Sequence, residues 1–221
     1  MKQFKDVIAE FIGTFALIFI GGGAVTVHLL TNGGVGLVGI GLAHALVILA
    51  MVYALAGISG AHFNPAVTIA MMINRRIEAL KGVKYIIAQL LGASVAAFAL
   101  KLIFPIATAE QLFGFPTSID MGVGILVEAI LTFFLVFVVY GVAVNKKATP
   151  NIFGIAIGGV ILFDIMMGGN ITGSAMNPAR AFGPAVASGL IGSQLIYWVG
   201  PIVGAVVASL VGETLFKEEK N

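Results

Sequence analysis

The sequence predicts an all-α membrane protein with six transmembrane helices and two re-entrant half-helices, arranged as an inverted 3+3 repeat. Of its 221 residues, 59% are hydrophobic and only 10% are charged, against about 25% charged residues in a soluble domain. The apolar residues gather in stretches of membrane-spanning length. One short motif, Asn-Pro-Ala, occurs twice, at Asn64 and at Asn177.

The composition excludes several classes of protein. A net charge of +2 and the lack of a basic run with interleaved aromatic residues exclude a nucleic-acid partner. The chain has no Cys, so disulfides and thiolate metal sites are excluded, and His28, His44 and His62 do not have zinc-ligand spacing. We therefore expect no metal and no cofactor. The first apolar run, 7–30, exceeds the roughly 7–15 residues of a signal peptide, so we expect a retained span.

Six stretches are long enough to span a bilayer, which takes about 20 residues. They are 7–30, 35–56, 83–104, 121–144, 151–167 and 194–216. The fifth is short. Two further apolar segments, Pro65–Ile73 and Pro178–Ser188, are too short to cross, and each follows one Asn-Pro-Ala copy. The pattern is therefore three spans with a half-helix after the second, given twice.

We expect a single transmembrane domain over residues 1–221, with one repeat at about 5–104 and the second at about 121–216. The halves also share a Glu followed four residues later by Thr-Phe, at Glu10 and at Glu128. Because each repeat has an odd number of spans, the two repeats insert upside down relative to each other. Broken helices in such repeats place the functional site at the membrane midplane.

The repeated motif has the chemistry of a helix start. Asn is a strong N-cap, and Pro suits the first helical position. The half-helices therefore begin at Asn64, Pro65 and Ala66 in the first repeat and at Asn177, Pro178 and Ala179 in the second. Each N-terminus carries a charge of about +0.5, which opposes a cation, and the amides can donate two hydrogen bonds to a passing oxygen. This combination favours single-file passage of a small neutral molecule.

Few ionisable residues lie at membrane depth. Arg180, just after the second motif, is a functional candidate by default; the alternative is a side chain that snorkels outward. Glu10 and Glu128 either accept the unpaired N–H groups of the re-entrant loops or relay protons, and their matching positions favour loop support. His62 either lines the inner vestibule or caps its loop. Asp164 has no counterpart in the first half, and we assign it no role.

Lys and Arg residues indicate the orientation. They gather at alternate ends of the spans, at Lys2, Lys5, Arg75, Arg76, Lys81, Lys84, Lys146, Lys147, Lys217 and Lys220. By the positive-inside rule both termini are cytoplasmic, and we expect a multi-pass protein of the cell membrane. Lys101, near the outer end of the third span, is the exception, and we expect it to snorkel.

With both Asn-Pro-Ala copies, the paired glutamates and the trailing Arg180, the chain resembles the major intrinsic protein (aquaporin) family over roughly 7–216. Its motif pattern is most similar to archaeal and other prokaryotic aquaporins. The resemblance implies the aquaporin-like fold, one pore per protomer and a homotetramer in the lipid bilayer.

The resemblance also implies a four-residue outer constriction, which falls on His44, Ile165, Ser174 and Arg180 by spacing from the motifs. Water-selective members usually carry Phe and His at the first two places. Ile165 with Ser174 is similar to the archaeal aquaporins, and His44 with Ile165 is similar to the plant tonoplast group, some of which pass ammonia. The alternative for His44 is a hydrogen-bonded histidine on a helix face. Ile165 removes a polar group from the constriction.

Glycerol facilitators resemble the chain less. They carry an Asp after the Arg, a later basic residue and a Pro-Leu pair, where this sequence has Ala181, Ala185 and Tyr197-Trp198.

We expect a passive channel for water and other small neutral solutes, such as ammonia and glycerol, that excludes protons and ions. The alternative is a proton-coupled secondary transporter, since such proteins share inverted repeats, but few residues are available to titrate. No nucleophile–base pattern indicates an enzyme.

Overall fold

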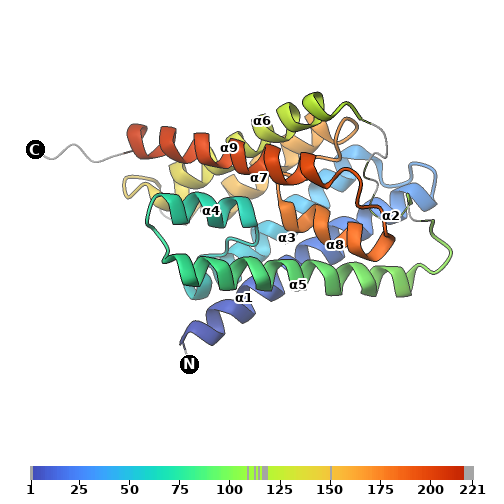
Figure 1. Cartoon of the computed structure of the whole chain (residues 1–221), viewed down its shortest axis with the longest axis horizontal. Coiled ribbons are helices and arrows are strands. Elements are labelled where there is room, and N and C mark those ends of the chain that lie inside the picture. The colour runs from blue at the N-terminus through green and yellow to red at the C-terminus, as the bar shows by residue number, and fades with distance from the viewer. Residues whose placement is uncertain are drawn as a thin grey trace, which may run out of the picture.

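The computed structural model describes residues 2–108, 110–111, 113, 115, 119–149 and 151–216. Regular structure in these ranges is helical throughout (Figure 1). The elements are α1 (Lys2–Ala16), the π-helix η1 (Leu17–Gly22), α2 (Gly23–Leu30), α3 (Gly36–Ser59), α4 (Pro65–Ile73), α5 (Ala79–Ile103), α6 (Met121–Val139), the π-helix η2 (Tyr140–Val144), α7 (Phe153–Gly168), α8 (Pro178–Ser188) and α9 (Gln194–Leu215).

The expected spans are present in the expected order. Five continuous helices are long and apolar enough to cross a membrane: Phe4–Leu30, Gly36–Ser59, Ala79–Ile103, Met121–Val144 and Gln194–Leu215. The sixth, α7, is apolar but has only 16 residues. The third span begins at Ala79 rather than at residue 83, because the helix includes a first turn that contains Lys81, which an apolar count leaves out. Together these elements form a multi-pass membrane protein.

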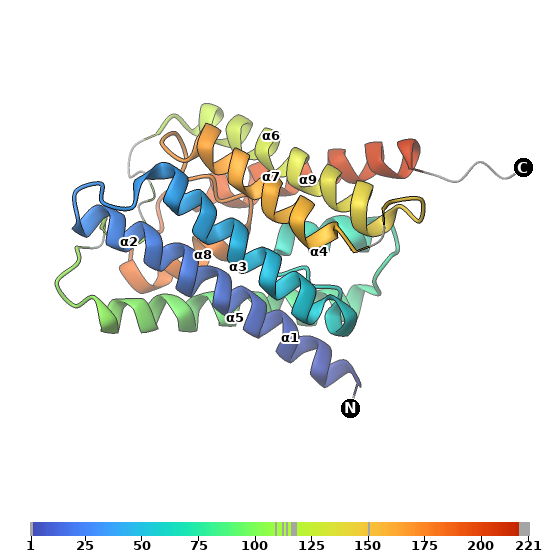
Figure 2. The same cartoon turned by 180° about the vertical axis from the view of Figure 1, so that it is seen from behind.

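The two halves of the chain are related by inversion. In Figure 1, α1 and α6 run in opposite directions along the bundle, and the start of α1 and the end of α9 lie at the same end, as Figure 2 also shows. The packing follows the same relation, since α1 packs on α5 as α6 packs on α9, and α8 packs on α5 as α4 packs on α9. This is the inverted 3+3 repeat that the sequence predicts.

Close packing of the long helices depends on small residues. A Cβ at Gly92 of α5 would lie 2.5 Å from the carbonyl oxygen of Phe11 in α1. In the matching pair, a Cβ at Gly204 of α9 would overlap the carbonyl oxygen of Ala129 in α6. Lipid offers no hydrophobic drive for helix association, so such close approach supplies the dispersion energy that holds the spans together.

Lys101 is exposed, and its ammonium group reaches the end of a neighbouring helix. Its Nζ donates a hydrogen bond of 2.7 Å to the carbonyl oxygen of Ala187, in the last turn of α8. A cation at this position interacts favourably with the negative end of a helix dipole. Lys101 therefore holds the C-terminal end of the second half-helix against α5.

Candidate transport pore

The two half-helices begin as their capping residues predict. The Oδ1 of Asn64 accepts the N–H of Ala66 at 2.9 Å. The Oδ1 of Asn177 accepts the N–H groups of Ala179 at 2.9 Å and Arg180 at 3.3 Å. Both Asn residues have extended backbones, and a Pro follows each at the first helical position. In Figure 1, α4 and α8 occupy opposite halves of the bundle's length.

The asparagine side chains also join the two repeats. The Nδ2 of Asn64 donates to the carbonyl oxygen of Met176 at 2.8 Å, and the Nδ2 of Asn177 donates to the carbonyl oxygen of Phe63 at 2.9 Å. Each primary amide has two N–H donors, so one donor per Asn remains for a molecule in the pore. The structure thus brings the two Asn-Pro-Ala copies together at one place.

Glu10 supports the loop before α4 from a fully buried position. Its Oε1 accepts the Ser59 hydroxyl at 2.6 Å and the N–H of His62 at 3.0 Å, and its Oε2 accepts the N–H of Phe63 at 2.7 Å. The Nε2 of Gln89 also donates to Oε2, at 2.8 Å. Buried backbone donors without acceptors are costly, so this carboxylate stabilises loop backbone at membrane depth.

Glu128 does the same for the loop before α8. Its Oε1 accepts the Thr172 hydroxyl at 2.7 Å and the N–H of Ala175 at 2.9 Å, and its Oε2 accepts the N–H of Met176 at 2.6 Å.

Four residues of the two re-entrant loops have backbones in the left-handed region, which is unfavourable for residues with a Cβ. They are Ala61 (φ 51°), Phe63 (φ 50°), Ser174 (φ 46°) and Met176 (φ 52°).

A matching pair of tyrosines was missed by sequence reasoning. The Tyr85 hydroxyl donates to the carbonyl oxygen of Ser59 at 2.8 Å, and the Tyr197 hydroxyl donates to that of Thr172 at 2.8 Å. Both rings are fully buried. The signal was present, because the chain has only four Tyr and these two follow their Asn-Pro-Ala motifs at nearly equal distances.

His44 and Arg180 form a direct contact at the expected constriction. The Nε of Arg180 donates to the Nε2 of His44 at 3.0 Å, while the Nδ1 of His44 bonds the carbonyl oxygen of Ile40 at 2.9 Å. Because Nε2 acts as an acceptor, the proton of this imidazole resides on Nδ1. The Nη1 of Arg180 donates to the carbonyl oxygens of Gly173 at 2.9 Å and Ser174 at 3.1 Å. Arg180 is thus turned inward rather than toward lipid.

The other two residues predicted at the constriction, Ile165 and Ser174, line the same cavity as this pair. Ile165 is 1% exposed, and the Ser174 hydroxyl donates to the backbone oxygen of Asp164 at 2.9 Å. The side chain of Asp164 is buried, and its Oδ2 has no hydrogen-bond partner among the residues that the structure describes. The loop residue Ser174 therefore bonds the backbone of Asp164, a residue to which the sequence assigned no role.

Phe115, between α5 and α6, is a residue near Arg180 that the sequence did not indicate. Its ring lies 5.2 Å from the guanidinium carbon of Arg180, a cation–π contact, and 5.0 Å from the ring of Tyr197. The sequence shows only an aromatic residue between two spans and gives no sign that Phe115 contacts Arg180.

His62 lies between the start of α4 and the central cavity. Its Nδ1 lies 3.1 Å from the Thr68 hydroxyl in the first turn of α4, so the ring is held at the start of that half-helix. The same residue lines the central cavity, and its ring packs edge-on against Tyr85 at 5.5 Å.

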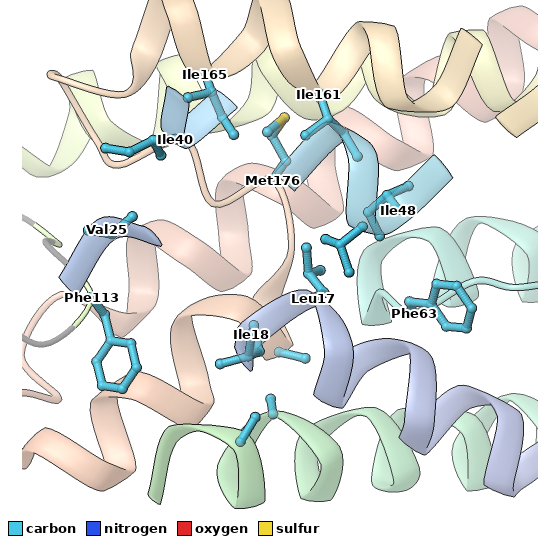
Figure 3. Packing of buried hydrophobic residues seen from close by; sticks show 14 of the residues in the cluster. Leu17, Ile18, Val25, Ile40, Ile48, Phe63, Phe113, Ile161, Ile165 and Met176 are labelled. Atoms are coloured by element: carbon cyan, nitrogen blue, oxygen red, sulfur yellow. The ribbon is translucent and has the colours of Figure 1, made fainter. Parts of the chain in front are cut away.

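One cavity of about 450 Å³ connects these groups. Its lining includes Arg76, Val144 and Phe153, both Asn residues and the four residues that the sequence predicts at the constriction. Figure 3 shows the aliphatic side chains at the centre of the bundle, among them Leu17, Ile48, Ile161 and Met176. A chain of polar groups along an aliphatic wall, at the junction of two inverted half-helices, is the arrangement of a membrane channel.

The chain belongs to the major intrinsic protein family, whose model matches residues 1–212. It is 43% identical to a probable aquaporin TIP-type of Medicago truncatula, covering 96% of this chain and 87% of that protein. It is 41% identical to the glycerol uptake facilitator protein-like 6 of Lactiplantibacillus plantarum, covering 97% and 100%. Among solved structures, the aquaglyceroporin of Plasmodium falciparum matches with a TM-score of 0.82 and 27% identity, covering 97% of both chains.

These similarities confirm the family and the fold but not a subgroup. The aquaporin NIP1-1 of Zea mays is 41% identical over 93% of this chain and 72% of its own length, the same identity as the bacterial glycerol facilitator-like protein. Ala181, Ala185 and Tyr197-Trp198 distinguish this sequence from glycerol facilitators. Overall sequence identity does not make that distinction. The family consists of channels, so the prediction that the chain is not an enzyme is confirmed.

Proposed function

We propose that the protein is a passive channel for water and small neutral solutes, including glycerol and ammonia, and that it excludes protons and ions. The observation that carries this proposal is the meeting of Asn64 and Asn177 in one cavity, each with one amide N–H left over. Relatives named as aquaporins and as a glycerol uptake facilitator support the same class of solute.

The proposed mechanism requires no protein group to change its charge. A neutral solute exchanges hydrogen bonds with water for bonds to the two asparagine amides, while the positive ends of two half-helices oppose a cation at the same point. His44, Ile165, Ser174 and Arg180 form the selectivity constriction in this proposal. Glu10 and Glu128 support the loops, and His62 lines the inner vestibule.

Stopped-flow light scattering on proteoliposomes tests the proposal. We expect osmotic shrinkage several-fold faster than in empty vesicles, with a low activation energy, and faster re-swelling in glycerol. Shrinkage at the rate of empty vesicles with a high activation energy contradicts the channel. Saturable, gradient-dependent uptake instead supports a proton-coupled secondary transporter.

We further propose a homotetramer in the cell membrane, with one domain formed by repeats at about 5–104 and 121–216 and with both termini cytoplasmic. The distribution of Lys and Arg supports this orientation; Lys217 and Lys220 lie outside the described residues.

The chain has no Cys, so single cysteines can report the orientation. We expect a membrane-impermeant thiol reagent added to intact cells to label Ile106→Cys, which is 84% exposed between α5 and α6. Lys147→Cys, in the exposed turn between η2 and α7, is expected to react only after permeabilisation. The opposite pattern means the opposite orientation.

A further inference from the structure

The first span is not an α-helix throughout, because it contains a π-helical turn. η1 (Leu17–Gly22) interrupts the span between α1 and α2, and it packs against α3, α5 and α8. The second π-helix, η2, lies more than a turn further along its own repeat, at Tyr140–Val144. π-turns are rare and occur often at functional sites. The helices that η1 contacts include those that carry His44 and Arg180.

Gly21, in this turn, lies directly against the imidazole of His44. A Cβ built at Gly21 would overlap the His44 Nε2 and lie 2.5 Å from Cδ2 and 2.8 Å from Cε1. Distances below 3.0 Å do not occur for real Cβ atoms, so this ring position exists only because residue 21 has no side chain. Both ring nitrogens are already engaged, Nδ1 by the Ile40 carbonyl and Nε2 by the Nε of Arg180.

The inverted repeat does not itself require glycine at this position. By spacing from Glu128, the residue of the second half that matches Gly21 is Val139. By spacing from Asn177, the residue that matches His44 is Ile157. The second half thus has neither the glycine nor the imidazole. Because the glycine occurs only in the repeat that has the histidine, we attribute it to the histidine rather than to helix packing in general.

We propose that Gly21 is a positioning residue that determines the solute specificity of the outer constriction, by setting where the His44 ring lies and through it the guanidinium of Arg180. This inference rests on the proposed channel function. Within the described part of the chain, His44 lines the cavity and Gly21 does not. A methyl group at residue 21 therefore pushes the imidazole toward the lumen, and the narrower opening hinders glycerol more than water.

The test is Gly21→Ala in proteoliposomes, with water and glycerol permeability measured on the same vesicles. We expect the glycerol-to-water ratio to fall at least about tenfold, the lower end of the discrimination that one methyl-sized change gives in a pocket. The matched control is Gly23→Ala, where a Cβ would meet only the Leu100 Cδ2, at 3.3 Å. The control is expected to keep the wild-type ratio.

A second variant separates positioning from general damage. In our proposal Gly21→Ala acts through the His44 ring. The double variant Gly21→Ala/His44→Ala is therefore expected to have the same glycerol-to-water ratio as His44→Ala alone. If Gly21→Ala alone does not reconstitute, the double variant is expected to do so, because the overlap is gone.

The inference is overturned if Gly21→Ala keeps the wild-type glycerol-to-water ratio. It is also overturned if Gly21→Ala lowers this ratio equally in the wild-type and His44→Ala backgrounds, or if it fails to fold in both backgrounds. Wild-type vesicles no more permeable than empty ones instead overturn the proposed function itself.

Discussion

Replacing Glu128 by Ala is expected to leave almost no folded channel. The substitution removes the acceptor of the Thr172 hydroxyl and of the N–H groups of Ala175 and Met176, all in a buried loop. Each buried donor left without a partner costs about 1–3 kcal/mol. Three such losses approach the total stability of a typical domain, about 5–15 kcal/mol. Water cannot replace the carboxylate oxygens at this depth without entering the packed loop.

Thermal unfolding and size-exclusion chromatography in detergent measure this effect. Glu128→Ala is expected to give little monodisperse protein and a strongly lowered unfolding midpoint. Glu78→Ala is the control, because Glu78 is exposed and its side chain makes no capping hydrogen bond to α5. A Glu128→Ala protein that folds as well as wild type but transports no solute indicates a proton relay, the alternative that the sequence left open, and contradicts the support role.

The half-helices were predictable because their starts are determined locally. Asn64-Pro65 and Asn177-Pro178 combine an N-cap with the residue best suited to the first helical position, and the observed helices Pro65–Ile73 and Pro178–Ser188 begin there. The loop supports were predictable for a related reason. A lone buried carboxylate at a matching place in each repeat needs donors, and re-entrant loops supply them.

The contacts around Arg180 depend on tertiary structure and were only partly predictable. Spacing from the motifs placed His44 on the correct helix, but nothing in the sequence indicates the hydrogen bond from Arg180 to its Nε2. The π-turn η1 changes the phase of the first span, so a periodic helix pattern cannot predict that Gly21 faces α3. The contact of Phe115 with Arg180 joins residues that are far apart in the sequence, so no local rule predicts it.

Replacing Arg180 by Val is expected to admit protons and small cations while water permeability persists. Arg180 is 6% exposed and places one positive charge in the constriction, held by His44 and two loop carbonyls. Two unit charges 4 Å apart repel by about 4 kcal/mol at an effective dielectric constant of about 20. The half-helix dipoles remain in the variant and still oppose cations. We therefore expect the proton flux to rise by about tenfold to a thousandfold.

Arg76→Val is the matched control, because Arg76 lines the same cavity and also carries one positive charge. Its side chain is 40% exposed and paired with Glu213, so water and the carboxylate already screen that charge. Proton flux is measured with a pH-sensitive dye trapped in proteoliposomes under a potassium diffusion potential. Arg180→Val vesicles as tight as wild type refute the barrier role. An equal leak in Arg76→Val means that the total charge of the cavity, and not the placement of Arg180 against His44, excludes cations.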